Sequence, residues 1–535
     1  MSKYTLKVPI RPFLLVWLLT AAVLVVFSLM VAINVLSQLW LFVPLLMLLL
    51  VAYDTFQHKS TLRRNYPLVG RLRYLFESVR PEIRQYFFEG ELDGKPFNRR
   101  QRSIVYQRAK NEKQTISFGM QDDPNRIGYE WAAHSIYPKK ADRSAFRLMF
   151  GNAQCKQPYS SSIFNIGAMS YGALSRTAIT SLNRGAKIGN FAHNTGEGGI
   201  SEYHLQGGDL IWQIGTGYFG CRTHQGSFSA SQFAKNANLP QVKMIELKLS
   251  QGAKPGHGGI LPAAKNTPEI AGIRNVAPHT TVHSPASHSA FNNAIEMMLF
   301  LGTLRILSGG KPVGFKVCIG RKEEFLDIVD AIHGTGIVPD FITIDGAEGG
   351  TGAAPLEFID YMGMALVDAL VFVNNVLDEN GLKDQIKIVA SGKMITAFDL
   401  AKALSLGADA CYSARGMMFS LGCIQALICD SDKCPVGIAT QNKALYKAID
   451  VPLKSHRVAN FHKNTMKALA EFIGACGVQH PSELTPEIFF KRTALNQNKS
   501  FAELYFNIER RPATSRTSMK ALSGLPDQQL ENRAV

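Results

Sequence analysis

The sequence has few charged residues and no C-x-x-C pair of cysteines. Only 19% of its 535 residues are Asp, Glu, Lys or Arg, which excludes the highly charged, intrinsically disordered proteins. Its eight cysteines include no C-x-x-C pair, and they do not resemble the framework of a small disulfide-stabilised domain. No internal repeat of about 20–50 residues is visible, which argues against solenoids and propellers. The length suits one large domain with additional segments.

Acidic residues are scarce relative to basic ones. The chain has 42 Asp and Glu against 58 Lys and Arg, a formal charge of +16. Basic chains bind nucleic acid, anionic lipid or acidic small molecules. Much of the positive charge lies between His58 and Lys113, directly after an apolar segment, where it favours a membrane-orientation signal. We therefore expect no nucleic-acid partner.

Two long apolar runs occupy the N-terminus, over residues 13–36 and 39–53. A membrane-spanning helix needs roughly 20 apolar residues, so the runs predict a transmembrane helical hairpin within residues 1–56. A cleaved signal peptide is the competing interpretation. The first run is long for such a peptide, and a second run follows it at once.

Basic residues flank both apolar runs, and by the positive-inside rule both flanks stay in the cytoplasm. We therefore expect a multi-pass protein of the cell inner membrane with a cytoplasmic catalytic part. The flanking residues are Lys3, Lys7, Arg11, Lys59, Arg63, Arg64, Arg71 and Arg73.

Between residues 160 and 440, short apolar runs alternate with Gly-rich loops and helix-like stretches. This alternation predicts an α/β fold with parallel strands, and we expect a (β/α)8 TIM barrel. An open doubly wound sheet is the alternative. One of the nine strand candidates must be extra, and we expect it to be 211–215, because another candidate follows it without a clear helix. The candidates are residues 163–169, 191–195, 211–215, 244–249, 280–284, 313–318, 341–345, 386–391 and 410–414.

The chain is thus expected to have four parts. The hairpin covers residues 1–56, and a basic helical or irregular segment covers 57–154. The barrel with its cysteine loop covers 155–485, and a tail covers 486–535. A helical C-terminal extension is expected from about residue 445.

Glycines and hydroxyl side chains recur where the strand candidates end, which in a barrel is the ligand-binding face. Two such loops follow the last two strands, with Ser391, Gly392 and Lys393 in one and Arg415 and Gly416 in the other. Backbone N–H groups beside a cation suit a phosphate, so these loops predict a phosphate site. Ordinary barrel turns are the alternative. The recurring segments are 167–175, 193–199, 248–259, 283–288, 344–355, 390–393 and 413–418.

Lys316 lies in an otherwise apolar strand candidate, GFKVC. A charge there must face the barrel mouth or be paired. It therefore suits either a cation beside a reduced flavin or a structural ion pair. The segment GTGYFG (215–220) matches G-x-G-x-x-G, but no convincing helix follows it, so we reject a dinucleotide-binding fold.

Three cysteines lie close together, Cys423, Cys429 and Cys434, with the spacing C-x5-C-x4-C. Three thiolates can hold an iron–sulfur cluster. Many zinc sites would add histidines, and none lies between Cys411 and Ser455. The spacing alone leaves a cluster and three packed cysteines equally open.

The segments GAMSYGALS, NTGEGG, QGAKPGHGG, GGTGAAP and GCIQALICDSDKCPVGIATQ, in this order, resemble the FMN-binding synthase domain of glutamate synthase. The resemblance covers roughly residues 155–485. It implies an FMN cofactor and a 3Fe–4S cluster held by the three cysteines. It also implies that ammonia and 2-oxoglutarate form an imine, which the flavin reduces to glutamate with electrons that enter through the cluster.

The same resemblance implies the roles of individual residues. Glu197 and Lys254 would be catalytic, whereas Gln251 and Arg274 would bind the substrate. The implied or expected FMN-binding residues are Ala168, Met169, Ser170, Lys248, Lys316, Gly349, Gly350, Ser391, Gly392, Lys393, Arg415 and Gly416.

The chain departs from the family pattern in three places. It has PGHGGILPA where PGEGGQLPG is usual, so His257 replaces a carboxylate and Ile260 replaces an amide. Glu348 stands where an aspartate is usual. An apolar Ile260 cannot hydrogen-bond a substrate carboxylate, so a different 2-oxo or amino acid is an open alternative. A non-catalytic membrane-bound scaffold or electron carrier is a further one.

Two modules of the family's large enzymes are not recognisable. The first is the glutamine amidotransferase domain, whose nucleophile is an N-terminal cysteine, whereas this chain opens with MSKYTL. We therefore expect the ammonia to be free or to come from a partner. No NAD(P)H module is visible, so a separate electron donor protein is expected.

Overall fold

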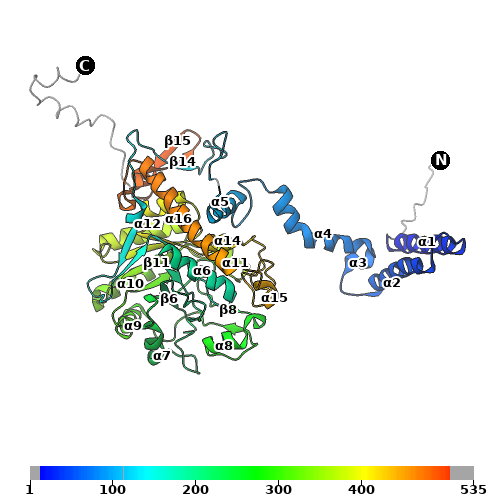
Figure 1. Ribbon diagram of the computed structural model, residues 1–535, viewed down its shortest axis with the longest axis horizontal. Helices are drawn as coiled ribbons and strands as arrows, with labels where there is room; N and C mark the ends of the chain where they lie inside the picture. The colour runs from blue at the N-terminus through cyan, green and yellow to red at the C-terminus, as the bar shows by residue number, and fades with distance from the viewer. Residues whose placement is uncertain (1–11, 113, 507–535) are drawn as a thin grey trace, which may run out of the picture. The chain divides into compact units, whose positions relative to one another are not determined.

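The computed structural model describes residues 12–112 and 114–506, and the chain divides into two compact units after Arg99. Each unit is described by itself (Figure 1). The expected flanking charges Lys3, Lys7 and Arg11 lie outside the described residues.

The second unit is built around a closed barrel of eight parallel strands in chain order. The first strand pairs with the last and the fourth with the fifth, so the sheet has no free edge. This confirms the barrel and excludes the open sheet. The strands are β4 (Phe164–Ile166), β5 (His193–Asn194), β6 (Leu210–Ile214), β7 (Val242–Lys248), β10 (Val313–Val317), β11 (Phe341–Asp345), β12 (Lys387–Ser391) and β13 (Ala410–Ser413).

The prediction that residues 211–215 form the extra strand is wrong. Strand β6 belongs to the barrel, and all five of its residues are buried. The extra strand is in 280–284, where β9 (Val282–His283) pairs antiparallel with β8 (Ile260–Leu261) outside the barrel. The helix after β6 was missed because α7 (Ala230–Ala237) has only eight residues and begins after a long loop.

Helices cover the outside of the barrel (Figure 1). Within the described residues no helix separates β5 from β6. The long helix α16 (Val451–Ala475) packs against α6, α13 and α14 and completes the outer layer. The other covering helices are α6 (Arg176–Gly189), α9 (Ala294–Leu307), α10 (Lys322–Thr335), α12 (Leu366–Glu379), α13 (Ala397–Ser405) and α14 (Arg415–Leu421).

A buried carboxylate lies inside the barrel. Glu246 on β7 is fully buried and accepts hydrogen bonds from Asn194 Nδ2 (2.8 Å) and Gln213 Nε2 (2.6 Å). Thr343 Oγ1 donates a third, at 2.7 Å. A buried polar group is tolerated when its partners are present, and here β5, β6 and β11 supply them. The barrel interior therefore holds a carboxyl group whose hydrogen-bond partners come from three other strands.

The expected helical extension is only partly present. Helix α16 is followed by β14 (Phe489–Ala494) and β15 (Gln497–Ser500), which form an antiparallel sheet with β1 (Glu130–Ala132). Residues 486–506 are therefore folded rather than a tail. This β-hairpin was missed because the turn between β14 and β15 lacks the Asn-Gly or Asp-Gly signal of a two-residue loop.

The predicted segment 57–154 belongs to both units. Its helix α5 (Arg99–Lys110) contacts α16.

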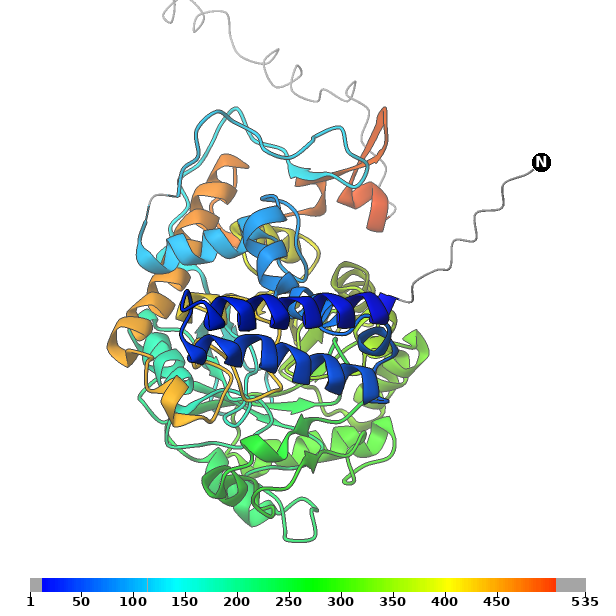
Figure 2. The ribbon, with the colours of Figure 1, turned by 90° about the vertical axis from the view of Figure 1, so that its right-hand side faces the viewer.

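The first unit contains two long apolar helices. The stretches Leu14–Ala32 and Gln38–Phe56 have 19 residues each and mean hydropathies of 2.8 and 2.0, so length and composition allow each to cross a membrane. They belong to α1 (Pro12–Ala32) and to η1 (Gln38–Leu41) with α2 (Phe42–Phe56). Trp17 Nε1 donates to Thr55 Oγ1 at 3.0 Å, which ties the start of one to the end of the other. The two helices lie side by side as an antiparallel pair (Figure 2).

A buried ion pair between Asp340 and Arg305 lies at the amino-terminal end of β11, and its contribution to stability can be measured. Asp340 is fully buried and accepts from Arg305 Nη2 (2.9 Å) and from the backbone N–H groups of Asn152 and Val313 (2.8 Å each). We expect Asp340→Ala to lower the free energy of unfolding by about 3–5 kcal/mol, because Arg305 is left buried without its counter-charge.

Urea denaturation of the detergent-purified protein measures this loss. Glu471→Ala is the control, since its pair with Lys467 is mostly exposed and contributes at most about 1 kcal/mol. Equal losses in the two variants would contradict the assignment.

Candidate active site

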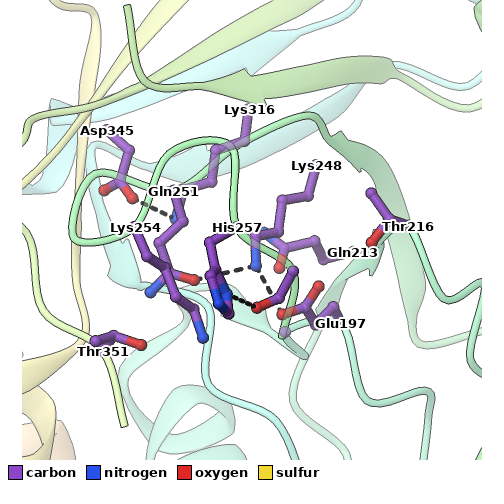
Figure 3. Close-up of polar contacts among 12 residues, drawn as sticks. Glu197, Gln213, Thr216, Lys248, Gln251, Lys254, His257, Lys316, Asp345 and Thr351 are labelled. Atoms are coloured by element: carbon purple, nitrogen blue, oxygen red, sulfur yellow. Dashed lines mark hydrogen bonds and ion pairs between the residues drawn. The ribbon is translucent and has the colours of Figure 1, made fainter. Parts of the chain in front are cut away.

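A group of charged side chains meets at the carboxyl ends of the barrel strands (Figure 3). Lys248, the last residue of β7, donates from Nζ to Glu197 Oε1 at 2.7 Å and to Gln251 Oε1 at 3.0 Å. Glu197 follows β5 in a loop that turns at Gly196, where φ is +65°. A Cβ at Gly196 would lie 2.6 Å from the Ser170 backbone N. Glycine therefore allows the Glu197 loop to lie directly on the loop that follows β4.

The loop after β7 is seated on the loop after β11. Gly252 N donates to Asp345 Oδ2 at 2.9 Å, and a Cβ at Gly252 would lie 1.8 Å from the Gly346 carbonyl oxygen. Only glycine fits at this contact. Gln251 and Lys254 in this loop donate to the carbonyl oxygens of Gly350 (3.1 Å) and Ala353 (3.0 Å). The predicted catalytic and substrate-binding side chains of this loop are thus held over the mouth.

The charges in this group act on one another. Burial acts to raise the pKa of Glu197, but Lys248, Lys254 and Arg274 outweigh it and hold that pKa below its usual value. Burial lowers the pKa of Lys254, Lys248 lowers it further, and Glu197 opposes both. Glu197 is therefore a carboxylate, and Lys254 releases its proton more readily than an exposed lysine. A buried acid and base with shifted pKa values are typical of a catalytic site.

Lys316 on β10 forms the ion pair that the sequence left as an alternative. Its Nζ lies 3.2 Å from Asp345 Oδ2. Burial acts to lower the pKa of Lys316, but Asp345 and Glu246 raise it above the usual value. Lys316 is therefore a fixed cation at the barrel mouth, and its role toward a flavin stays a prediction.

The predicted phosphate loops are neighbours on the rim. Residues 391–393 follow β12 as predicted, whereas Arg415 and Gly416 do not lie in a loop but begin α14, directly after β13. Strands β11, β12 and β13 pair in this order, and β4 with the 168–170 loop comes next. Arg415 Nη2 donates to the Thr351 carbonyl oxygen, and a Cβ at Gly350 would lie 3.0 Å from Arg415 Nε. Ser391 Oγ donates to Asp345 Oδ1 at 2.8 Å. The structure thus brings these glycine-rich loops together along one arc of the rim.

Arg274, the last residue of α8 (Pro268–Arg274), is buried against the loops that follow β4 and β5. It is 5% exposed, donates from Nη2 to the Tyr171 carbonyl oxygen at 3.1 Å, and stacks 4.9 Å from the Phe219 ring. Burial lowers its pKa to about 10, opposed by Glu197. It supports the Glu197 loop, and substrate contact by Arg274 stays a prediction.

The residues that depart from the family pattern lie in the same loop as Lys254. His257 Nδ1 lies 2.8 Å from the Gly258 carbonyl oxygen, and its ring is edge-on to Phe358. Ile260 begins β8. A Cβ at the intervening Gly259 would lie 2.9 Å from Glu197 Oε1, so this part of the loop borders the Glu197 carboxylate.

Two residues of the site were not predicted. Asp345 connects Lys316, Ser391 and Gly252, although its motif IDGAEGG was noted. His288 is buried, its Nε2 lies 2.9 Å from the Lys248 carbonyl oxygen, and burial lowers its pKa to about 4. Their partners come from distant loops, and no spacing in the sequence reveals such partners.

The three cysteines lie in the loop after α14. Cys423 and Cys429 are partly exposed and Cys434 is buried. The buried Lys265 Nζ donates to the carbonyl oxygens of Cys429 (2.7 Å) and Ala173 (3.1 Å), which joins this loop to the one after β4. In the described part of the chain no three His, Cys, Asp or Glu side chains are arranged to hold a metal ion. The iron–sulfur site stays a prediction.

The closed parallel barrel with a charged rim is the scaffold of an α/β-barrel enzyme. The chain also matches the conserved region in glutamate synthase over residues 124–479. It is 38% identical over 476 residues to a glutamate synthase large subunit-like protein of Bacillus subtilis (strain 168), covering 81% of this chain and 90% of that protein. The chain therefore belongs to the glutamate synthase family and is a glutamate synthase-like oxidoreductase.

A more distant relative and a solved structure show weaker similarity. An archaeal glutamate synthase (NADPH) of Methanocaldococcus jannaschii is 32% identical over 358 residues, which is 66% of each chain. The flavin-binding domain of baker's yeast flavocytochrome b2 is 12% identical with a TM-score of 0.42, covering 82% of this chain and 91% of that one. At that TM-score the structural likeness carries no functional argument.

The coupling of Glu197 to Lys254 predicts a pH dependence. The ammonium form of Lys254 is lost as the pH rises through its lowered pKa, and Glu197 acts to raise that pKa. In Glu197→Gln the pKa of Lys254 falls further. We therefore expect the binding of a small dicarboxylate such as malonate to weaken at a lower pH than in the wild type.

Isothermal titration calorimetry over a pH series measures the midpoint of this loss. Glu348→Gln is the matched control, because the Glu348 carboxylate accepts from Leu366 N and leaves the Glu197 group intact. An unchanged midpoint in Glu197→Gln would refute the coupling.

Proposed function

We propose that the chain is an FMN- and iron–sulfur-dependent glutamate synthase-type oxidoreductase. It reduces the 2-imino acid formed from 2-oxoglutarate and ammonia to glutamate. The observation that carries the proposal is the Glu197–Lys248–Gln251 group with Lys254 over the mouth of a barrel of this family.

The rim fits FMN. The glycine-rich loops along the rim would let backbone N–H groups approach a ligand closely. Arg415 supplies a cation beside these loops, where the phosphate of FMN would bind, and Lys316 supplies a second cation at the barrel mouth. Bound FMN supplies the hydride for the reduction. The residues proposed to hold it are Ala168, Met169, Ser170, Lys248, Lys316, Gly349, Gly350, Ser391, Gly392, Lys393, Arg415 and Gly416.

The substrate meets the charged group at the mouth. The ammonium of Lys254 binds a carboxylate of the 2-oxo acid, and its lowered pKa favours transfer of a proton to the carbonyl oxygen, which leaves as water when the imine forms. The ionised Glu197 orients ammonia and accepts a proton from the nitrogen after that nitrogen has bonded to the carbonyl carbon and become positively charged. The Gln251 amide and the buried Arg274 hold the carboxylate end of the substrate.

A second substrate is favoured by a specific observation. Gly259 borders the Glu197 carboxylate, its neighbours in the same loop include His257 and Ile260, and Ile260 has no group to bind a second carboxylate. A less polar 2-oxo or amino acid would then replace 2-oxoglutarate, with the same residues at the reacting carbon.

Cys423, Cys429 and Cys434 are proposed to ligate a 3Fe–4S cluster, because they share one loop and Lys265 joins that loop to the rim. A cluster held by these cysteines would supply one-electron chemistry, with a separate protein as the electron donor.

The first unit is proposed to anchor the chain in the cell inner membrane, with the barrel in the cytoplasm. Two antiparallel apolar stretches of 19 residues support this. Lys59 and Arg64 follow the second stretch and favour a cytoplasmic end, whereas Arg63 and Arg71 are paired with Asp54.

The function is tested on the detergent-purified protein, reduced chemically and mixed with ammonium and 2-oxoglutarate. We expect flavin absorption bands and glutamate detectable by mass spectrometry. Lys254→Ala should keep the flavin bands and lose about 100-fold or more in rate, because a proton donor contributes that much.

Lys443→Ala removes an exposed lysine and serves as the control. An undiminished rate in Lys254→Ala would refute its role. Turnover of another 2-oxo acid, without turnover of 2-oxoglutarate, would favour the second substrate.

The cluster is tested separately by EPR spectroscopy of protein purified without oxygen. We expect Cys429→Ala to abolish the signal of an oxidised 3Fe–4S cluster and to leave FMN bound, because the cysteine loop and the glycine-rich arc are different segments. Cys476→Ala, which changes a cysteine outside that loop, should keep both signals. Loss of the flavin together with the cluster would contradict this separation.

A further inference from the structure

Helix α4 (Val69–Ile83) of the first unit exposes a row of large apolar side chains. The exposed fractions reach 62% at Phe76 and 55% at Leu75. The row continues into the π-helical turn η2 (Arg84–Phe88), where Phe87 is 80% exposed. The exposed apolar residues are Val69, Leu72, Leu75, Phe76, Val79, Ile83, Tyr86, Phe87 and Phe88.

The spacing places most of these residues on one face. Positions 72, 75, 76, 79 and 83 recur at intervals of three and four, which in a helix form a single stripe. Arg73, Arg80 and Arg84 also share a face, and at 100° per residue it adjoins the apolar stripe. All three arginines are exposed. The helix therefore presents an apolar face bordered by three arginines. Arg73 pairs with the exposed Glu77 at 3.1 Å and Arg84 lies 4.0 Å from Glu89, and such pairs of exposed arginines are weak enough to open for a phosphate.

The opposite side of α4 is fixed to the end of the second apolar stretch. Asp54, in the last turn of α2, is fully buried. Arg71 donates two hydrogen bonds to the Asp54 carboxylate, from Nε (2.7 Å) and from Nη2 (2.8 Å), and Leu68 N donates a third at 3.1 Å. Gly70 packs against the backbone of α3 (Thr61–Asn65), where a Cβ would lie 3.2 Å from Arg63 Cα. Helix α4 therefore begins at the level where α2 ends.

We infer that α4 and η2 lie in the interface of an anionic membrane, with the apolar face among the acyl chains and the arginines at the headgroup phosphates. The inference rests on the membrane anchorage proposed above and adds a second, interfacial contact to it. Amphipathic helices with a basic border and aromatic residues bind such surfaces. The attachment at Asp54 keeps α4 at the depth where headgroups would surround it, which favours lipid over a protein partner as the occupant.

The test uses the full chain in vesicles, with a photoreactive phenylalanine analogue at one position. At position 76 we expect lipid adducts by mass spectrometry. At position 78, where the exposed Ser78 lies on another face of the helix, we expect water adducts instead. Position 49 in α2, where Leu49 is 60% exposed, reports the anchorage itself.

A second series replaces the arginines one by one with glutamine. In vesicles that contain phosphatidylglycerol, the lipid adducts at position 76 should fall up to about fivefold for each of Arg73, Arg80 and Arg84 removed. In phosphatidylcholine alone these variants should match the wild type. Arg126→Gln, on the second unit, should have no effect in either vesicle.

The outcomes separate the two proposals. Lipid adducts at position 49 but not at 76 would overturn the interfacial helix and keep the anchorage. No lipid adducts at either position would overturn both. Adducts at position 76 to another protein, or to a second copy of this chain, would show that a protein covers this face.

Discussion

The rim of the barrel depends on the carboxylate of Asp345. It pairs with Lys316, accepts from Ser391 Oγ and accepts from the backbone of Gly252. These groups come from β10, β12 and the loop after β7, so one side chain joins three segments that are distant in sequence. Because Asp345 accepts from Gly252 N, it also holds in place the loop that carries Gln251 and Lys254. The loop with the proposed catalytic residue Lys254 is therefore held by the same carboxylate that pairs with the buried Lys316.

The second constraint is the balance of charge above that pair. One carboxylate, Glu197, faces the cations Lys248, Lys254 and Arg274, and all three act to keep it ionised. A site with more buried cations than carboxylates favours anions, because an added negative charge reduces the electrostatic cost of the excess. This holds for any 2-oxo acid, and so the excess of cations does not distinguish 2-oxoglutarate from a less polar relative. Under the proposed function, the discrimination would fall to other residues of the mouth, and His257 and Ile260 are the candidates because they share a loop with Gly259, which borders Glu197.

The sequence predicted the barrel because each strand is a short apolar run that ends in a polar loop, and seven of the eight chosen runs were correct. The error at 211–215 arose because a short helix after a long loop leaves little periodic pattern. The hairpin over 489–500 was missed because its turn lacks the usual residues. Glu197 and Lys254 were chosen from a resemblance, whereas Asp345 and His288 depend on partners that only the folded chain brings together. The cysteine spacing was visible, but spacing does not fix the direction of thiols.

The packing of α16 against α6 has a consequence for the order of events during synthesis. A Cβ at Gly185 of α6 would lie 2.6 Å from Val458 Cβ, so these helices are in close contact although they lie at opposite ends of the barrel sequence. Strand β4 likewise finds one neighbour, β13, only near the end of the barrel sequence. Such long-range pairing is slow, because the intervening chain must be ordered first. While the ribosome is still translating, the first half of the barrel exposes an unpaired strand edge and the apolar side of α6, which is the surface that a chaperone would hold.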